Sequence, residues 1–374
     1  MTITKCLEKV QDFRKDRGKI YSIVSIIKLI VAGLLYNKNN LKSIARFGQS
    51  LSRKERKALG FERDRVPCYS NLTIIIRKIV VESFREIISE LIAYILQTNK
   101  KVECKVLHID GKTLRGSDSY GGNAQTQILS AFSSQIKAIT GFEEIHNKDE
   151  YHAMLRLLSK HDIEDKIITA DAAFCHEIAC EKTIEEGGDF AFALKANEAN
   201  LYYYSSKEFD EIDGKANEIR YFEEEVDLQH GRIEKRKIEA IDMPFEYLNG
   251  FRHIKQICRI TREREQKGYP DSFSSETALM ITSLGKEFNP EALLKLNRNH
   301  WCCENNLNWV KDEVFGEDKS TISTGKAPLV MSLLRSIALS VINSISDKIT
   351  ETREMFNNHR NKLFKLFAIK EIDF

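Results

Sequence analysis

The sequence has no apolar run long enough to cross a membrane. Its most apolar stretch, residues 20–36, is about 17 residues long and contains Lys28, and residues 327–342 are interrupted by Arg335. A membrane-spanning helix needs about 20 predominantly apolar residues. The first stretch also lacks a signal-peptide cleavage pattern. Both stretches are therefore expected to be buried helices of a soluble cytoplasmic protein without a membrane partner.

The sequence also lacks paired cysteine motifs. It contains eight cysteines, but neither the group Cys175, His176 and Cys180 nor the adjacent Cys302 and Cys303 has the CxxC spacing of structural zinc sites. Without an extracellular signal, these thiols are expected to be reduced, as in a cytosol. No internal repeat or low-complexity segment occurs, so the 374 residues are expected to form two or three ordinary domains.

Charge is distributed unevenly along the chain. Residues 1–100 contain 20 Lys and Arg against 9 Asp and Glu, or +11, and the remainder contains 37 against 46, or −9. The overall net charge of +2 hides this difference. A basic N-terminal part joined to an acidic remainder favours a polyanionic partner that one part holds and the other cuts. The alternative is ordinary variation of charge along a chain.

Residues 1–98 are predicted to form a helical, basic DNA-binding domain. Apolar and basic positions alternate there at helical spacing. Residues 40–60, followed by a polar turn and residues 70–80, are a candidate helix-turn-helix. The candidate phosphate contacts are Arg53, Lys54, Arg56, Lys57, Arg63, Arg65, Arg77 and Lys78. For each single side chain, a solvated helical face without a ligand is an equally good interpretation.

Residues 99–206 are predicted to form the first part of a mixed α/β core. Short apolar runs predict strands at residues 105–110, 127–133, 138–145, 167–171 and 190–194. Helical patterns are found at residues 149–161, 176–186 and from residue 200. Three strands, then a helix, a strand, a helix, a strand and a helix, is the succession of an RNase H-like fold.

The remaining residues are predicted to complete that core around an insertion. Residues 207–284 contain alternating strand patterns and are expected to be a β-rich insertion. Residues 285–346 complete the core with a patterned helix, and residues 347–374 form a C-terminal helical tail. The insertion carries His230, Arg232, Lys235, Arg236 and Lys237. They are candidates for holding a nucleic-acid strand, and an exposed charged hairpin without a ligand is the alternative.

Three acidic residues in separate segments are the candidate metal ligands. Asp110 and Asp171 each follow a short apolar, β-branched run, which predicts a strand that delivers the carboxylate at its C-terminal end. Glu304 stands on the predicted helix near residues 290–315. Carboxylates of this kind hold two divalent metal ions, which stabilise the attacking and leaving oxygens of a phosphodiester.

The helix that carries Glu304 has a polar face. At about 100° per residue, His300, Glu304, Asn308 and Lys311 fall on one narrow side. Trp301, Trp309 and Val310 fall on the flanks and the opposite side, where packing is expected. Gly316 is the expected end of the helix.

Five ordered blocks of the sequence carry a family resemblance. They are DFRKDRGKIYSIVSII near the start, HIDGKTLRGS, IITADAAF with GGDFAFALKANEANL, HGRIEKRKI, and NRNHWCCENNLNWVKDEVFGEDKS followed by GKAPLVMSLLRSIAL. In these blocks the chain resembles the transposases of the H-repeat-associated group of bacterial insertion sequences, which belong to the DDE superfamily. The resemblance implies an RNase H-like catalytic core with a β-strand insertion.

The resemblance also implies roles for individual residues. Asp110 is the expected shared ligand of two Mg²⁺ ions, with Mn²⁺ as a substitute, and Asp171 and Glu304 are expected to bind one ion each. Lys311 and His300 are the expected contacts of a non-bridging phosphate oxygen. His300 stands where the wider family pattern has an arginine. Lys112 and Arg115, just after Asp110, are expected either to contact the DNA backbone or to stabilise a turn.

The expected function is therefore a DNA transposase. It would bind the terminal inverted repeats of its element as a homodimer, cleave the strands, and join them to target DNA in the bacterial nucleoid. Two alternatives stay open at this stage. One is an RNase H-like nuclease without strand transfer, and the other is a catalytically decayed DNA-binding remnant or repressor.

Overall fold

A computed structural model describes residues 2–17, 19–99, 102–117, 125–212, 219–228, 231–243 and 250–367. None of the helices within these ranges is both long enough and apolar enough to span a bilayer. The chain divides into two compact units. Unit 1 comprises Met1–Cys104, Gly111–Lys148 and Cys303–Phe374, and unit 2 comprises Lys105–Asp110 and Asp149–Cys302.

The N-terminal part of unit 1 is helical, as predicted. Its helices are α1 (Ile3–Leu7), α2 (Ile23–Leu35), α3 (Leu41–Ser50), α4 (Arg53–Ala58), α5 (Tyr69–Ile76) and α6 (Ser83–Thr98). Asn40 and Ser52 begin α3 and α4 with reciprocal capping hydrogen bonds, which satisfy free N–H groups of the first turn. α2 is buried almost all round, so the first apolar run forms the buried helix expected of it.

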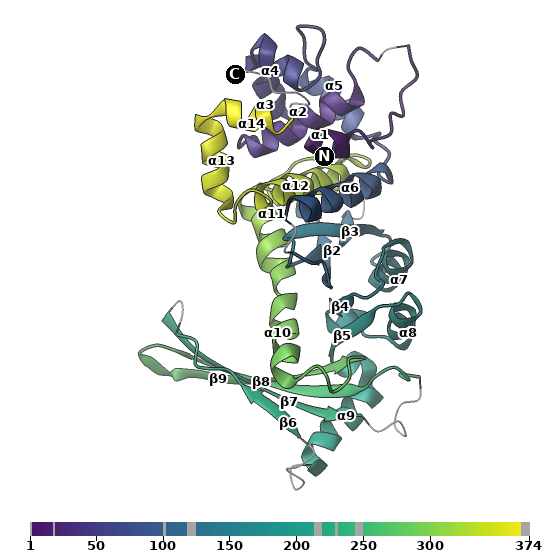
Figure 1. The fold of residues 1–374 in the computed structure, drawn as a ribbon, viewed down its shortest axis with the longest axis vertical. Coiled ribbons are helices and arrows are strands. Elements are labelled where there is room, and N and C mark those ends of the chain that lie inside the picture. The colour runs from purple at the N-terminus through teal and green to yellow at the C-terminus, as the bar shows by residue number, and fades with distance from the viewer. Residues whose placement is uncertain are drawn as a thin grey trace. The chain divides into compact units, whose positions relative to one another are not determined.

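The C-terminal part of unit 1 packs against these helices. It contains α11 (Trp309–Glu313), α12 (Ala327–Asn343), α13 (Ile349–Asn358) and α14 (Arg360–Lys365). Every residue of α12 except the last is buried, and the helix contacts both α2 and strand β3 (Ala138–Ile145). Ser340 of α12 accepts a hydrogen bond from the Ile139 N–H of that strand. Figure 1 shows α12 between the N-terminal helices and β3.

Unit 2 alternates strands and helices before the insertion. After the first part of β1 (Val106–Thr113), it contains α7 (Glu150–Lys160), β4 (Ile167–Ala170), α8 (Glu177–Glu185), β5 (Asp189–Leu194) and α9 (Ala199–Ile212). Short 3-10 turns η2 (Ala172–Phe174) and η3 (Ala196–Glu198) follow β4 and β5. β1, β4 and β5 are parallel neighbours.

The sheet confirms the predicted fold class. Its order is β3-β2-β1-β4-β5-β9-β8-β7-β6, where β2 is Gln127–Ser133 and pairs antiparallel with β3. The succession β1, β2, β3, α7, β4, α8, β5, α9 is the RNase H-like succession expected from the sequence. The insertion follows as β6 (Arg220–Glu223), β7 (Arg232–Asp242), β8 (Gln256–Gln266) and β9 (Tyr269–Thr282).

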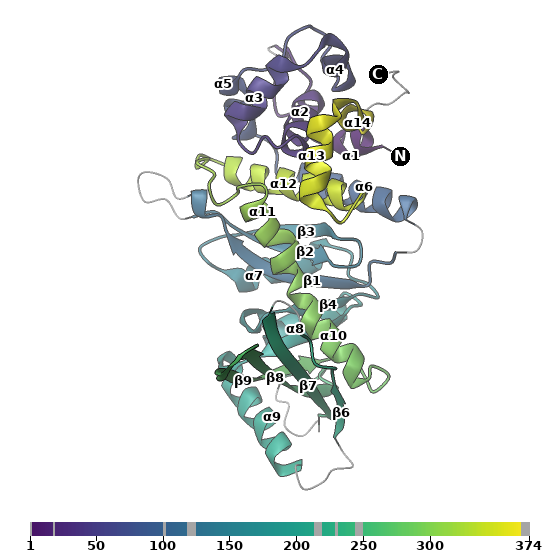
Figure 2. The ribbon, with the colours of Figure 1, turned by 90° about the vertical axis from the view of Figure 1, so that its left-hand side faces the viewer.

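The insertion forms long antiparallel strands that cover the helix α10 (Pro290–His300). Ile238, Ala240 and Ile260 of the strands pack with Leu293 and Leu294 of that helix in one apolar cluster. Figure 2 shows α9 running beside the β6–β9 strands, and α9 contacts β9. β8 ends five residues beyond the strand that the sequence predicts at residues 252–261, and β9 begins nine residues before the strand predicted at residues 278–283. Charged cross-strand pairs such as Glu234 with Arg262 continue the ladder where apolar patterning stops.

Candidate functional site

Asp110 and Asp171 lie beside each other on neighbouring parallel strands of unit 2. β1 and β4 pair in register as far as Ile109 and Ala170, and the two aspartates are the next residues of their strands. Neighbouring strands are about 4.8 Å apart. The predicted strand-end position is confirmed for Asp171, which directly follows β4. Asp110 instead stands inside β1, which continues to Thr113, at the point where the pairing with β4 ends.

His300, on the last turn of α10, contacts this pair of strands. Its Nε2 lies 3.4 Å from Oδ1 of Asp171, and its Nδ1 lies 3.0 Å from Oγ1 of Thr169. Thr169 and Asp171 are two residues apart, so their side chains share one face of the sheet. His108 and Asp110 share a face of β1 for the same reason. His300 therefore sits over the sheet face to which both aspartates belong.

Thr169 joins His108 and His300 on that face. Its hydroxyl lies 2.7 Å from Nδ1 of His108 and 3.0 Å from Nδ1 of His300. A hydroxyl has one hydrogen to donate and can accept at the same time. It can therefore donate to one ring and accept from the other, which fixes the orientation of His300 and, through it, of Asp171.

The loop after Asp171 is held by residues that follow β5. Asn197 donates from Nδ2 to the carbonyl oxygen of Ala172 at 2.8 Å, and His176 pairs through Nδ1 with Glu198 at 2.8 Å. The hydrogen bond from His300 is the main reason that the pKa of Asp171 is lowered; burial acts in the opposite sense. Asp171 is therefore a carboxylate at neutral pH, as a metal ligand must be.

The burial of His108 predicts a pH dependence of stability. Burial, with a smaller contribution from the charge of His300, lowers the pKa of His108 from 6.5 to about 3. Well above pH 6.5 the ring is neutral in both the folded and the unfolded chain, so it does not lower the free energy of unfolding. Between about pH 6.5 and pH 3 the unfolded chain binds a proton that the folded chain excludes, so stability falls by up to about 1.4 kcal/mol per pH unit.

Urea unfolding at several pH values tests this prediction. His108→Asn, which keeps a polar group toward Thr169, should lose that part of the slope between pH 6 and pH 4. A slope identical to that of the wild-type chain would contradict a neutral His108. His152→Asn is the matched control, because that histidine is exposed and pairs with Asp149.

Glu304 stands in a π-helical segment of unit 1, η6 (Cys303–Asn308), rather than in a regular α-helix. Its side chain is exposed, whereas Asn308 and Lys311 are buried. The predicted narrow face shared by these residues is therefore wrong. A π-helix closes i→i+5 rings, so each of its residues turns the chain by less than the 100° of the α-helix. Residues before and after the segment therefore no longer share the face that an α-helical wheel gives them.

The predicted packing of the two tryptophans is also wrong. Trp301 and Trp309 are 53% and 56% exposed, whereas Val310 is buried as expected. Arg262 of β8 lies over the Trp301 ring, 5.7 Å from its centre. The helix ends earlier than predicted: α11 stops at Glu313, and the left-handed Gly316, at φ 61°, lies three residues further on.

Lys112 and Lys311 form ion pairs with acidic side chains of unit 1. The Lys112 ammonium pairs with Asp312 and lies 3.1 Å from Glu317. The Lys311 ammonium lies 3.2 Å from the same carboxylate and is fully buried. Lys112 lies within β1 rather than in a turn, so these ion pairs differ from the turn-stabilising role that the sequence suggested. A contact between Lys311 and a phosphate would require this network to open.

The remaining predicted DNA contacts differ in their availability. Arg115 is largely exposed and pairs weakly with Asp318 at 3.5 Å. On the insertion, Arg232 is exposed, Lys235 pairs with Glu223, and Arg236 is mostly buried in a pair with Glu234. His230 lies outside the described residues.

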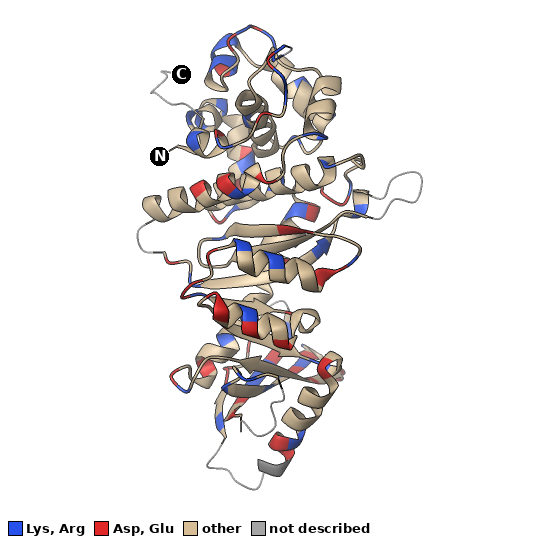
Figure 3. Ribbon diagram, turned by 90° about the vertical axis from the view of Figure 1, so that its right-hand side faces the viewer, with Lys and Arg blue, Asp and Glu red and all other residues tan. Residues whose placement is uncertain are grey.

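A basic concavity surrounds α4 in the N-terminal part of unit 1. Its volume is about 610 Å³, and its lining consists of Arg53, Lys54, Arg56, Lys57, Gly60, Phe61, Glu62, Arg63 and Asp64. Arg53, Lys54 and Lys57 are exposed, whereas Arg56 is held by Asp64 and by the carbonyl of Gln49. Lys and Arg are drawn blue on this helix and the loop after it in Figure 3.

The candidate metal ligands belong to both units. Asp110 and Asp171 are in unit 2, and Glu304 is in unit 1. Within the ranges that the structure describes, no three His, Cys, Asp or Glu side chains form a group that could hold a metal ion. The adjacent aspartates supply hard oxygen donors, which suit Mg²⁺ and Mn²⁺. The two strand positions in unit 2 thus supply two oxygen donors of the kind that such an ion takes.

Sequence reasoning missed three residues near Asp110 and Asp171. Thr169 and His108 lie two positions before them on their strands. Lys195 directly follows β5 and, after His300, lowers the pKa of Asp171 further. The available signal was strand alternation, which places residues two positions before each aspartate on the same face.

Comparison with known families identifies two matching regions. The family model described as "Transposase DDE domain" matches residues 105–341. The model described as "DDE_Tnp_1-associated" matches residues 4–92. Together they cover the N-terminal helices and the mixed α/β core.

Two relatives that match most of the chain come from Escherichia coli strain K12. "Putative protein YbfL" is 27% identical over 92% of this chain and 92% of its own length. "H repeat-associated putative transposase YhhI" is 26% identical with the same coverage. The solved structure "Cryo-EM structure of piggyBac transposase synaptic complex with hairpin DNA (SNHP)" matches with a TM-score of 0.42 and 12% identity, over 97% of this chain and 77% of that one.

Proposed function

The chain belongs to the DDE transposase family, and from this premise we propose that it cleaves and joins DNA at the inverted repeats of an insertion sequence. The observation that carries the proposal is the register of β1 and β4, which makes Asp110 and Asp171 neighbours on one face of the sheet. Two carboxylates delivered in this way need only a third to hold a pair of divalent ions. Glu304 is the proposed third.

The proposed cofactor is Mg²⁺, with Mn²⁺ as a substitute. When bound, such ions polarise a phosphate and lower the pKa of a water molecule. The protein's own part is to keep three carboxylates ionised and oriented. For Asp171 this is the work of His300, which pairs with one carboxylate oxygen at 3.4 Å and leaves the other for a ligand.

His300 is also the proposed contact of the scissile phosphate. It stands on the face of the sheet with both aspartates and is mostly buried, which fixes its ring. Lys195, exposed at the end of β5, adds positive charge beside Asp171. Positive charge and hydrogen-bond donors at such a site stabilise the charge that develops on the phosphate oxygens.

We propose that the basic concavity around α4 holds duplex DNA by its phosphates. Arg53, Lys54 and Lys57 are exposed there, and each phosphate contact by a cation releases counterions. The double variant Lys54→Ala with Lys57→Ala should weaken binding of any duplex. The slope of log K against log salt should become shallower by about 2.

Fluorescence anisotropy at several salt concentrations measures this slope. Lys348→Ala is the control, because Lys348 is equally exposed but pairs with Glu351 on α13. An unchanged salt slope in the double variant, or an equal change in the control, would remove α4 from the proposed DNA surface.

The proposed function is tested with the DNA that flanks the reading frame. The purified chain with Mg²⁺ should cut at the inverted-repeat ends and should insert a pre-cleaved end into a plasmid. Cutting without insertion would make the chain a nuclease without strand transfer. Binding without either reaction would make it a decayed DNA-binding remnant.

Two further parts of the proposal concern assembly and place. Two element ends must meet before joining, so a homodimer on DNA is proposed. Because its proposed substrate is the bacterial chromosome, the proposed site of action is the cytoplasmic nucleoid.

A further inference from the structure

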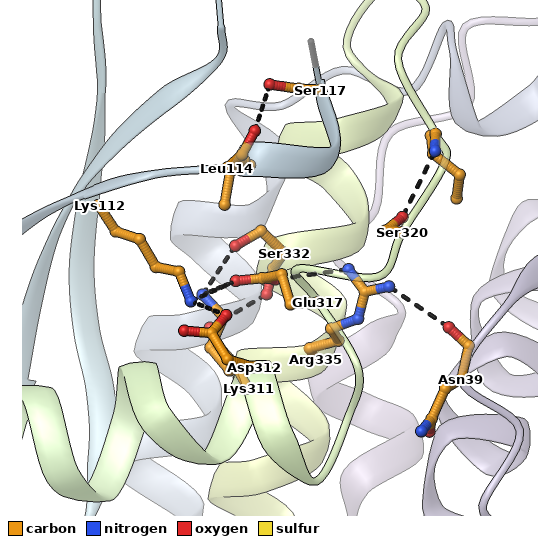
Figure 4. A network of polar contacts seen from close by, with 12 residues as sticks. Asn39, Lys112, Leu114, Ser117, Lys311, Asp312, Glu317, Ser320, Ser332 and Arg335 are labelled. Carbon is orange, nitrogen blue, oxygen red and sulfur yellow. Dashed lines mark hydrogen bonds and ion pairs between the residues drawn. The ribbon is translucent and has the colours of Figure 1, made fainter.

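Glu317 lies at the centre of a buried ionic network in unit 1. Its carboxylate is 3.1 Å from the Lys112 ammonium, 3.2 Å from the Lys311 ammonium and 3.4 Å from the Arg335 guanidinium. Figure 4 shows these three cations pointing toward it from different segments. The exposed fractions of Glu317, Lys311 and Arg335 are 3%, 0% and 2%.

Each of the three cations also has a further polar partner. Lys112 also pairs with Asp312, Lys311 donates to Oγ of Ser332 at 2.7 Å, and Arg335 donates to the carbonyl of Asn39 at 3.3 Å. Burial would raise the pKa of Glu317, but the charges of Lys311, Arg335 and Lys112 outweigh it and lower that pKa to about 2. The carboxylate is therefore ionised at neutral pH.

The backbone is shaped to bring Glu317 to this position. Gly316 adopts φ 61°, a left-handed conformation that glycine takes without strain. The reversal lets the N–H of Glu317 donate to the carbonyl of Lys311 at 2.9 Å. The chain thus folds back after α11, which brings the Glu317 side chain close to Lys311.

The three cations belong to segments that matter for the proposed site. Lys112 is on β1, two residues after Asp110, and Lys311 is seven residues after Glu304. Arg335 is on α12, which is buried along nearly its whole length. One carboxylate therefore ties the end of β1 and the segment that follows Glu304 to the most buried helix of the unit.

We propose that Glu317 is a positioning residue for the metal ligands. It acts through Lys112 on the strand of Asp110 and through Lys311 on the helical segment of Glu304, and it touches neither substrate nor metal. This inference rests on the proposed function, because it concerns the ligands assigned there. Groups that orient metal ligands typically change metal affinity or activity by about 10- to 100-fold when they are removed.

Mn²⁺ binding to the full-length chain tests the proposal. Glu317→Gln keeps the shape and removes the charge, and should raise the dissociation constant for Mn²⁺ by about 10- to 100-fold. Glu143→Gln is the matched control. Glu143 is a buried carboxylate of the same unit that pairs with Arg85 at 2.5 Å, and its loss should leave Mn²⁺ affinity within about twofold.

Each outcome has a defined meaning. Wild-type affinity in Glu317→Gln, or equal weakening in Glu143→Gln, overturns the positioning role while the proposed function stands. A wild-type chain that binds no Mn²⁺ removes the proposed function and the positioning role together. If Glu317→Gln does not fold, Glu317→Asp decides: its shorter side chain cannot reach all three cations, so intermediate affinity supports the proposal and wild-type affinity overturns it.

Discussion

Replacing Asp110 by Asn is expected to lower the rate of DNA strand cleavage by at least about a thousandfold, which corresponds to about 4 kcal/mol of transition-state stabilisation. The same loss is expected for Asp171→Asn and Glu304→Gln. An amide keeps the shape of the side chain but lacks the charge that holds a divalent ion. Affinity for the inverted-repeat ends in EDTA should not fall, because the proposed DNA contacts of α4 are elsewhere. Single-turnover cleavage with Mg²⁺, compared with end binding, measures both quantities.

Glu313→Gln is the control for this series. Glu313 is an exposed acid nine residues after Glu304, and its replacement should leave cleavage unchanged. Cleavage by Asp110→Asn at the wild-type rate would contradict the assignment of the ligands. Equal losses in Glu313→Gln would show that general acidity of this segment, rather than Glu304, is responsible.

Replacing Arg353 by Leu is expected to lower the free energy of unfolding by about 4 kcal/mol, because each buried acceptor left without a partner costs about 1–3 kcal/mol. Arg353 is 2% exposed. Its guanidinium donates to the carbonyls of Leu34 and Val314 and to Oδ1 of Asn39. These carbonyls are at the C-terminal ends of α2 and α11, where a cation is also favourable. Urea unfolding, followed by a spectroscopic signal from unit 1, measures this decrease in the free energy of unfolding.

Two variants make this measurement specific. Arg353→Lys should recover little stability, since one ammonium cannot reproduce a planar fork that serves three acceptors. Arg360→Leu is the matched control: it stacks on Tyr36 but is about a third exposed, so it should cost less than half as much. Equal costs at the two arginines would contradict a special role for Arg353.

The order of strands and helices could be predicted because the local signals agree with the fold. The β-branched runs before Asp110 and Asp171 form β1 and β4, and the apolar run of residues 20–36 contains the buried α2. Such segments carry their burial pattern in their own composition. The lengths of β8 and β9 could not be predicted, because their outer halves depend on charged partners across the ladder.

The side of the helical segment that carries Glu304 could not be predicted either. A helical wheel assumes the same rotation for every residue, and the π-helical segment η6, which contains Glu304, does not have the rotation of an α-helix. The burial of Lys112 and Lys311 depends on their ion pairs with Glu317, which the left-handed Gly316 brings into position. A single sequence offers no sign of that pairing. Strand alternation could have placed Thr169 on the same face as Asp171. Its contacts with His108 and His300 could not be predicted, because they depend on the register of β1 and β4.

The most direct test is the position of Mn²⁺ in crystals of the chain bound to an inverted-repeat end, located by anomalous scattering. Two peaks about 3.5–4 Å apart are expected, coordinated by carboxylate oxygens of Asp110, Asp171 and Glu304. Peaks that lack any one of these three ligands, or Glu304 directed away from the two aspartates in that complex, would contradict the proposed metal site.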